Sequence, residues 1–237
     1  RKEELHNMGA PFFIFNRINC KDKGILVNNL PPISKPERMY EEIEVPGRNG
    51  KLYIDNNCYN TFKYSITCTL MPGANIREIS KWLNGVGKLI LSTELDKEYD
   101  VIIKDQIDYE QTYRICNQFE VNFEVQPISR GVVEKEINLT EEGKIIIKES
   151  TYIIKPYLKI AGSGAITITI NNNSLNIKQI EDFIEIDCEL EEAYKDNENC
   201  NSNIQCETFP YFNPGENNIS WIGNIINMQI KYREAFI

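Results

Sequence analysis

The sequence predicts a mainly β protein of two domains. Hydrophobic and polar residues alternate over several short segments, which is the period of a half-buried strand, and the alternation is clearest over residues 166–170. Only one segment has a clear helical period. The length of 237 residues exceeds what one modest domain needs. We therefore expect two strand-rich domains, the second of them a sandwich.

The amino-terminal half contains six strand-like segments and one helix. The strands are expected at 12–15, 39–45, 59–70, 88–92, 99–107 and 118–126. Asn75 and Glu78 have capping-box spacing, and apolar residues recur at helical spacing over 76–83 before Gly85. The pattern predicts a helix that packs one face on a sheet, with Trp82 more often a core residue than an interface anchor.

The carboxyl-terminal half consists of strands alone. Residues 166–170 run into the turn-forming Asn171–Asn173 and a partner at 174–177, which predicts a hairpin. Further strands are expected at 183–188 and 226–233. Gly162, Ser163 and Gly164 are too short a run for a phosphate-binding loop, so we interpret them as a turn or bulge.

We place the domain boundary after residue 130, where charged and irregular sequence follows the strand that ends at Gln126–Pro127. The expected domains are 8–130 and 131–237. Residues 1–7 are interpreted as a cloning remnant before a natural start at Met8. No segment resembles a secretion signal or a membrane-spanning helix.

The chain is acidic, and unevenly so. Its 26 basic and 35 acidic side chains give a net charge of −9, which argues against binding to nucleic-acid phosphates or anionic lipid. Residues 1–130 carry a net charge of −1, and the remainder carries −8. Nine carboxylates lie in the segment 181–198, where we expect a solvated face and loop.

No catalytic, metal or cofactor site is predicted. The chain has a single histidine, His6, and lacks the phosphate-binding, zinc-protease and serine-hydrolase motifs. Its seven cysteines form no CxxC pair, so we expect mostly reduced core thiols in a chain made in the cytosol. Cys200 and Cys206 are close enough to pair, and the sequence leaves that question open.

A set of ordered segments resembles a known family. The segments are Leu30–Arg38, Glu41–Gly50, Tyr59–Phe62, Trp82–Ile90, Tyr99–Asp100, Pro156–Gly164, Ile186–Glu189, Phe209–Pro210 and Asn213–Trp221. Together they are similar to the distal tail proteins of long-tailed, non-contractile bacteriophages, or to a prophage-derived relative. The resemblance covers nearly the whole chain from about Met8.

The resemblance implies a fold and a role. It implies an amino-terminal β-sandwich or split-barrel-like domain with one helix and a β-hairpin, and a carboxyl-terminal galectin-like β-sandwich whose last strand in some relatives returns to the first domain. It implies a structural protein of the virion tail tip, made in the host cytoplasm, without enzymatic activity, cofactor or membrane insertion. About six subunits would form a ring that joins the tail tube protein to baseplate and receptor-binding proteins and lets DNA pass.

Two sets of residues are candidates for the functional surfaces. For the contact between subunits we select the turn Pro46, Gly47, Arg48, Asn49 and Gly50, with edge strands of the first domain. The alternative function is a carbohydrate-binding module that docks on cell-wall glycans. Its candidate platform consists of aromatic residues that are more often core residues: Tyr194, Phe209, Tyr211, Phe212 and Trp221. A glycan hydrolase that uses two carboxylates is a third hypothesis.

Overall fold

The computed structural model describes residues 9–109 and 118–237. Over these residues the chain is mainly β, with the single α-helix α1 (Ile76–Trp82), which confirms the predicted fold class. It divides into two compact units, the first ending at Ser129 and joined by Ile237, the second comprising Arg130–Phe236. His6, Met8 and Cys116 lie outside the described residues.

The first unit is built on one antiparallel sheet. Its strands lie in the order β2-β1-β7-β8-β9-β6-β3. Their bounds are β1 (Phe13–Phe15), β2 (Ile18–Asn19), β3 (Ile25–Asn29), β6 (Phe62–Leu70), β7 (Gly85–Leu91), β8 (Glu94–Ile103) and β9 (Gln118–Val125). A short 3₁₀ helix follows β2 at Cys20–Lys23.

Helix α1 packs on the core of this sheet. The Asn75 side chain accepts from the backbone N–H groups of Arg77 and Glu78, which satisfies donors that a helix start otherwise leaves free. The Glu78 carboxylate contacts the Asn75 side chain rather than its backbone. Trp82 stacks on Phe13 with ring centroids 5.9 Å apart. Its indole N–H donates to the Phe15 carbonyl at 3.1 Å. Trp82 is therefore a partly buried core anchor.

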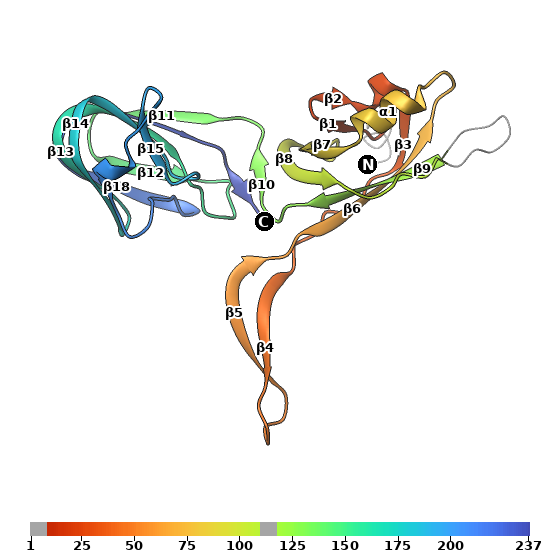
Figure 1. Ribbon diagram of the computed structural model, residues 1–237, viewed down its shortest axis with the longest axis horizontal. Helices are drawn as coiled ribbons and strands as arrows, with labels where there is room; N and C mark the ends of the chain where they lie inside the picture. Colours follow the sequence, from red (N-terminus) through yellow and green to blue (C-terminus); the bar gives the residue numbers. More distant parts are fainter. Residues whose placement is uncertain (1–8, 110–117) are drawn as a thin grey trace, which may run out of the picture. The chain divides into compact units, whose positions relative to one another are not determined.

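A separate two-stranded sheet belongs to the first unit. Strands β4 (Arg38–Glu44) and β5 (Lys51–Tyr59) pair only with each other among the described strands. Figure 1 shows this hairpin, in orange, extending away from β6. The sequence predicted β4 and the turn, but β5 was missed because Asp55, Asn56 and Asn57 interrupt its apolar pattern.

The second unit is one curled sheet with strand order β11-β18-β13-β14-β15-β16. Strand β12 also pairs with β18, and β17 with β14. The bounds are β11 (Lys135–Leu139), β12 (Gly143–Ile147), β13 (Tyr157–Ile170), β14 (Asn173–Asp187), β15 (Glu192–Lys195), β16 (Glu198–Asn199), β17 (Ile204–Gln205) and β18 (Gly215–Tyr232). A 3₁₀ helix lies at Asn201–Asn203, and the short strands β10 (Ser129–Gly131) and β19 (Ala235–Phe236) pair with each other.

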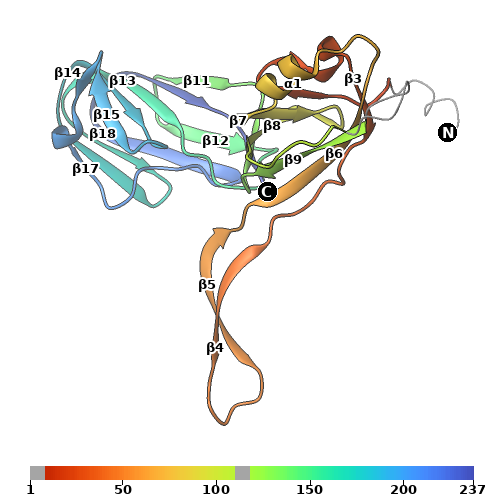
Figure 2. The ribbon, with the colours of Figure 1, turned by 45° about the vertical axis from the view of Figure 1, so that its right-hand side comes forward.

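Three long strands bend in the middle and so form both layers of the second unit. The register of β13 against β14 shifts between Gly164 and Ile166, and its register against β18 shifts over the same region. Figure 2 shows that β13 and β14 curve side by side. The shift lets both halves of β14 bury their apolar residues. These are Leu175 and Ile177 before the shift along the strand, and Ile184 and Ile186 after it. The predicted strands 174–177 and 183–188 are thus one strand, and the glycine run is a bulge.

Candidate interaction surface

The five predicted turn residues lie together at the tip of the β4–β5 hairpin. The N–H of Arg48 donates to the Val45 carbonyl at 3.1 Å, which closes a turn with Pro46 and Gly47 at its centre. Gly47 has φ +80, as the third position of a type II turn requires, and Pro46 has the fixed φ that the second position favours. Residues 46–50 are all exposed.

The two faces of the hairpin differ in chemistry. Residues directly opposite each other in an antiparallel pair share a face, and Ile43 lies opposite Leu52, with Ile54 two residues further along β5. Val45 continues this side. We call Ile43, Val45, Leu52 and Ile54 the apolar face of the hairpin; the exposed carboxylate of Glu41, opposite Ile54, lies on the same side at the end nearer the base. Leu52 is 39% and Ile54 43% exposed, so large aliphatic side chains meet solvent here.

The opposite face is polar and aromatic. Tyr40 and Tyr53 meet edge to face with centroids 6.3 Å apart. The ammonium group of Lys51 donates to Glu42 at 2.5 Å. These contacts join the strands across the pair, and they leave the polar face satisfied within the hairpin itself.

The base of the hairpin is held by Arg38. Its guanidinium donates to Asp55 through Nε at 2.9 Å and to the Asn57 side chain at 3.0 Å. It also lies 5.6 Å from the centre of the Tyr59 ring. The hydrogen bond from Arg38, reinforced by the Asn57 N–H, lowers the pKa of the Asp55 carboxyl. This cluster surrounds the register shift between Arg38 and Tyr40.

The physical consequence is an unpartnered apolar surface. An isolated two-stranded hairpin is at best marginally stable in water, because neither face is covered. Here the polar face is internally bonded, whereas the apolar face has no cover from the described residues. Contiguous exposed apolar surface of this kind is typical of protein–protein contacts.

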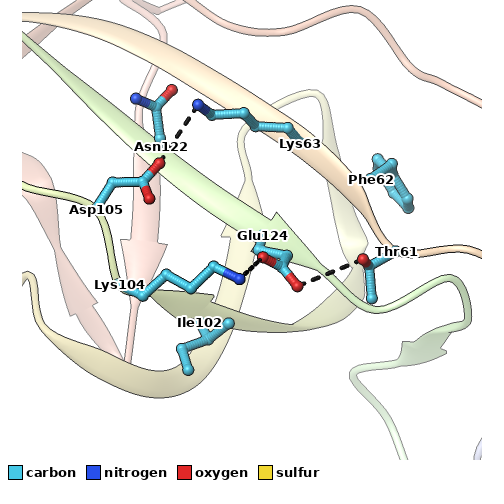
Figure 3. Close-up of a pocket in the computed structure, with 8 residues that line it drawn as sticks. All are labelled: Thr61, Phe62, Lys63, Ile102, Lys104, Asp105, Asn122 and Glu124. Atoms are coloured by element: carbon cyan, nitrogen blue, oxygen red, sulfur yellow. Dashed lines mark hydrogen bonds and ion pairs between the residues drawn. The ribbon is translucent and has the colours of Figure 1, made fainter.

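A groove lies beside the strand that follows the hairpin. It has a volume of about 220 Å³ and is lined by residues of β6, β8, β9 and their loops: Thr61, Phe62, Lys63, Ile102, Lys104, Asp105, Asn122 and Glu124. Figure 3 shows that its lysines and carboxylates face one another. Lys63 pairs with Asp105 at 3.4 Å, and Lys104 pairs with Glu124. Because these charges neutralise each other, we find no isolated acid, base or nucleophile in the groove.

The predicted glycan residues are not brought together. Phe212 has no exposed surface and packs edge to face on Tyr232, so it cannot serve as a platform and is a core residue. Trp221 lies opposite the fully buried Ile168 in the β13–β18 register and is half-buried on that side. Tyr211, which directly precedes Phe212 in the chain, is half-buried, and so is Phe209. Tyr194 lies elsewhere, with its ring 6.4 Å from that of Tyr157.

Other classes of site have little support among the residues the structure describes. These contain no cluster of histidine, cysteine and carboxylate side chains that could hold a metal ion. No helix in the same ranges is both long and apolar enough to span a bilayer. Cys20, Cys68 and Cys188 are buried, and burial raises the pKa of the Cys68 thiol to about 12. Cys200 and Cys206 are both free thiols.

The comparisons with known proteins find a likeness to phage tail proteins. Residues 18–125 match the phage tail protein RIFT-related domain, so the first unit carries a domain of phage tail proteins. No curated protein matches the sequence significantly.

A solved structure extends the likeness over the whole chain. It is the Dit protein (gp 19.1) of phage SPP1, described as a paradigm of the hub adsorption apparatus in phages that infect Gram-positive bacteria. The TM-score is 0.78 at 11% identity, over 96% of this chain and 100% of that one. The chain thus has a Dit-like fold, and the predicted resemblance to the distal tail proteins is confirmed.

Proposed function

We propose that the protein forms a closed ring at the tip of a phage tail, and that the apolar face of the hairpin is the main contact between neighbouring copies. The observation that carries the proposal is the hairpin itself: four aliphatic side chains on one face, with an ion-paired and aromatic opposite face. A surface that its own chain leaves uncovered is best explained by a partner that covers it.

Geometry favours a cyclic arrangement over a symmetric pair. A projecting arm that seats on a different surface of the next copy makes a heterologous contact, and such contacts close into rings when the rotation permits. We propose about six subunits, as the family resemblance implies. The exposed tip, Pro46–Gly50, would then reach furthest onto the neighbouring copy.

The ring would join the tail tube protein to the baseplate and receptor-binding proteins, with DNA passing through its lumen. Neither half of the chain carries a net positive charge, −1 over residues 1–130 and −8 over the remainder, which is consistent with a lumen that does not retain a polyanion. The second unit would be an accessory domain whose own partners lie among the adsorption proteins. On this proposal the protein acts through its surfaces and not as an enzyme.

Mass in solution tests the proposal. Light scattering behind a sizing column, over a concentration series, should show a species near six times 27.5 kDa, about 165 kDa. Leu52→Asp places a charge in the centre of the apolar face and should shift the mass to 27.5 kDa. A wild-type mass of 27.5 kDa at every concentration would contradict self-assembly through the hairpin.

A matched control lies in the same strand. Tyr53→Asp makes the same kind of change one residue away, on the opposite face, at a side chain that is 59% exposed. This variant should keep the mass of the wild type. If Tyr53→Asp dissociates the assembly and Leu52→Asp does not, the contact belongs to the polar face and the assignment of faces is wrong.

A further inference from the structure

The chain contains two Asn–Gly pairs, Asn49–Gly50 and Asn84–Gly85, and both lie in the first unit. Asparagine is one of the thermally labile residues of proteins. In an Asn–Gly pair the backbone nitrogen of the glycine can attack Cγ, the carbonyl carbon of the asparagine side chain, because glycine has no Cβ to shield that nitrogen. The attack requires a backbone that is free to rotate, and the two pairs differ in this freedom.

The pair Asn49–Gly50 lies at the tip of the β4–β5 hairpin and is exposed. Gly50 has φ +81, and no atom lies within 4 Å of the position that a Cβ would take. Among the described residues, neither the N–H of Gly50 nor the side chain of Asn49 has a hydrogen-bond partner. A segment with so few contacts changes its backbone conformation at almost no cost in free energy. The conformation that the attack requires is therefore accessible in the folded chain.

The pair Asn84–Gly85 is held on both sides. The N–H of Asn84 donates to the Trp82 carbonyl at 3.0 Å, directly after helix α1, and Leu83 between them is buried. Gly85 is the first residue of β7 and lies opposite Ile103 of β8. The backbone here cannot rotate unless the strand pairing opens locally, which costs free energy. The same dipeptide is thus restrained at one place in the fold and unrestrained at the other.

We propose that Asn49 is a site of spontaneous deamidation and that the fold protects Asn84. The nitrogen of Gly50 forms a bond to Cγ of Asn49, the Cγ–Nδ2 bond breaks, and ammonia leaves with the proton that Gly50 loses. Water then adds to the resulting cyclic imide and opens it at one of its two carbonyl groups. The products are aspartate and isoaspartate, and in isoaspartate the main chain runs through the former side chain.

The reaction changes the tip of the hairpin. Either product places a carboxylate next to Arg48 and close to Val45, where the apolar face of the hairpin ends. Isoaspartate also lengthens the main chain by one methylene group. One consequence rests on the proposed function: in a ring the neighbouring copy covers the tip, so assembled subunits keep Asn49 whereas unassembled subunits lose it with age. The deamidation itself requires no assembly.

Mass spectrometry of the incubated full chain measures both sites. Cleavage after glutamate separates them into peptides 45–78 and 79–94, and fragment ions locate the change from amide to carboxylate. Reference rates come from the chain denatured in guanidinium chloride. In folded Leu52→Asp, which keeps the tip uncovered, Asn49 should convert within about threefold of its denatured rate. Asn84 should convert at least about tenfold more slowly than its own denatured rate, because it waits for local opening.

Asn49→Gln is the matched control. It keeps the amide but requires a larger ring for the attack, so it should abolish conversion at position 49 and leave the rate at Asn84 unchanged. In the parent chain the rate at Asn49 should rise with pH, because the attacking nitrogen of Gly50 must lose its proton. Protection of Asn84 reports, within each sample, that the first unit is folded.

Equal rates at Asn49 and Asn84 in folded Leu52→Asp would overturn the proposal. Light scattering on wild-type samples incubated in parallel separates this result from ring assembly. A ring mass together with slower conversion of Asn49 than in Leu52→Asp supports both the site and its coverage by a neighbour. A mass of one subunit with conversion as fast as in Leu52→Asp contradicts the ring and supports the deamidation site.

Discussion

Gly162 and Gly223 occupy the point where β13 and β18 cross the bend of the second unit. A Cβ atom on Gly162 would lie 2.3 Å from the Asn224 carbonyl oxygen. Gly223 has φ +115, and a Cβ there would lie 2.6 Å from the Ala165 carbonyl oxygen. The obstacles are backbone atoms, which cannot rotate away as a side chain can, so only glycine fits.

Substitution at this bend should therefore be costly. Gly162→Ala and Gly223→Ala are each expected to destabilise the second unit by at least about 2 kcal/mol, since the backbone must shift and Gly223 also loses its left-handed conformation. Urea unfolding measures the change. Gly143→Ala is the control, because nothing lies within 4 Å of its Cβ position. An equal effect of all three variants would show that the bend is not tightly packed.

A buried carboxylate organises one end of the first core. Glu94 is 7% exposed and accepts from the Tyr99 hydroxyl and the Lys97 ammonium, each at 2.5 Å. The ring of Tyr99 packs edge to face on Tyr64, with centroids 5.7 Å apart. Burial, reinforced by the bond to Glu94, raises the pKa of Tyr99. The charge of Glu94 is thus compensated by two donors from its own strand.

Removing one donor tests this network. Tyr99→Phe keeps the ring packing and deletes the hydroxyl, and should lower the free energy of unfolding of the first unit by about 1.5–3 kcal/mol, the range for hydrogen bonds to charged groups. Denaturant unfolding followed by Trp82 fluorescence gives the value. A stability equal to that of the wild type would mean that Glu94 is satisfied by Lys97 alone.

At the scale of elements, the base of the β4–β5 hairpin is held by the pairing of the Arg38 and Asp55 side chains. The pKa of Asp55 is lowered in the folded hairpin, chiefly by the hydrogen bond from Arg38. A carboxyl with a lowered folded pKa contributes stability above its unfolded pKa of about 3.9, and this contribution is lost as the pH falls through the folded value.

The hairpin base should therefore loosen in acid. Amide exchange in β4 and β5 is expected to be slower in the wild type than in Asp55→Asn at pH 6, and the difference should shrink progressively as the pH falls below the unfolded pKa of about 3.9. NMR-detected hydrogen exchange measures both. Asp108→Asn, a change at an exposed carboxyl outside the hairpin, is the control. A difference between wild type and Asp55→Asn that persists in acid would rule out the Arg38–Asp55 pair as its source.

For the whole molecule, each unit has a core of its own. The first core mixes aliphatic side chains with several aromatic ones, among them the fully buried Phe13, Phe15 and Phe123, whereas isoleucines line the second. Each unit also contains one of the two tryptophans, Trp82 and Trp221. Stability changes in one core should consequently not carry over to the other.

Selective fluorescence tests this independence. With Trp221→Phe as background, Tyr99→Phe should shift the Trp82 transition to lower urea. With Trp82→Phe as background, Gly162→Ala should shift the Trp221 transition alone. If either substitution shifts both transitions equally, the protein unfolds as one cooperative body.

Local sequence by itself determined the strand-rich class, helix α1 and the turn at Pro46–Gly50, because period, capping and turn chemistry act over a few neighbouring residues. The tertiary structure decided which of these segments pair. It joined 174–177 and 183–188 into β14 across a register shift, and it paired the polar β5 with β4. It also buried Phe212, while placing Tyr194 beside Tyr157 on the outer face. Strand pairing and burial depend on contacts between residues far apart in the chain, and no local pattern encodes them.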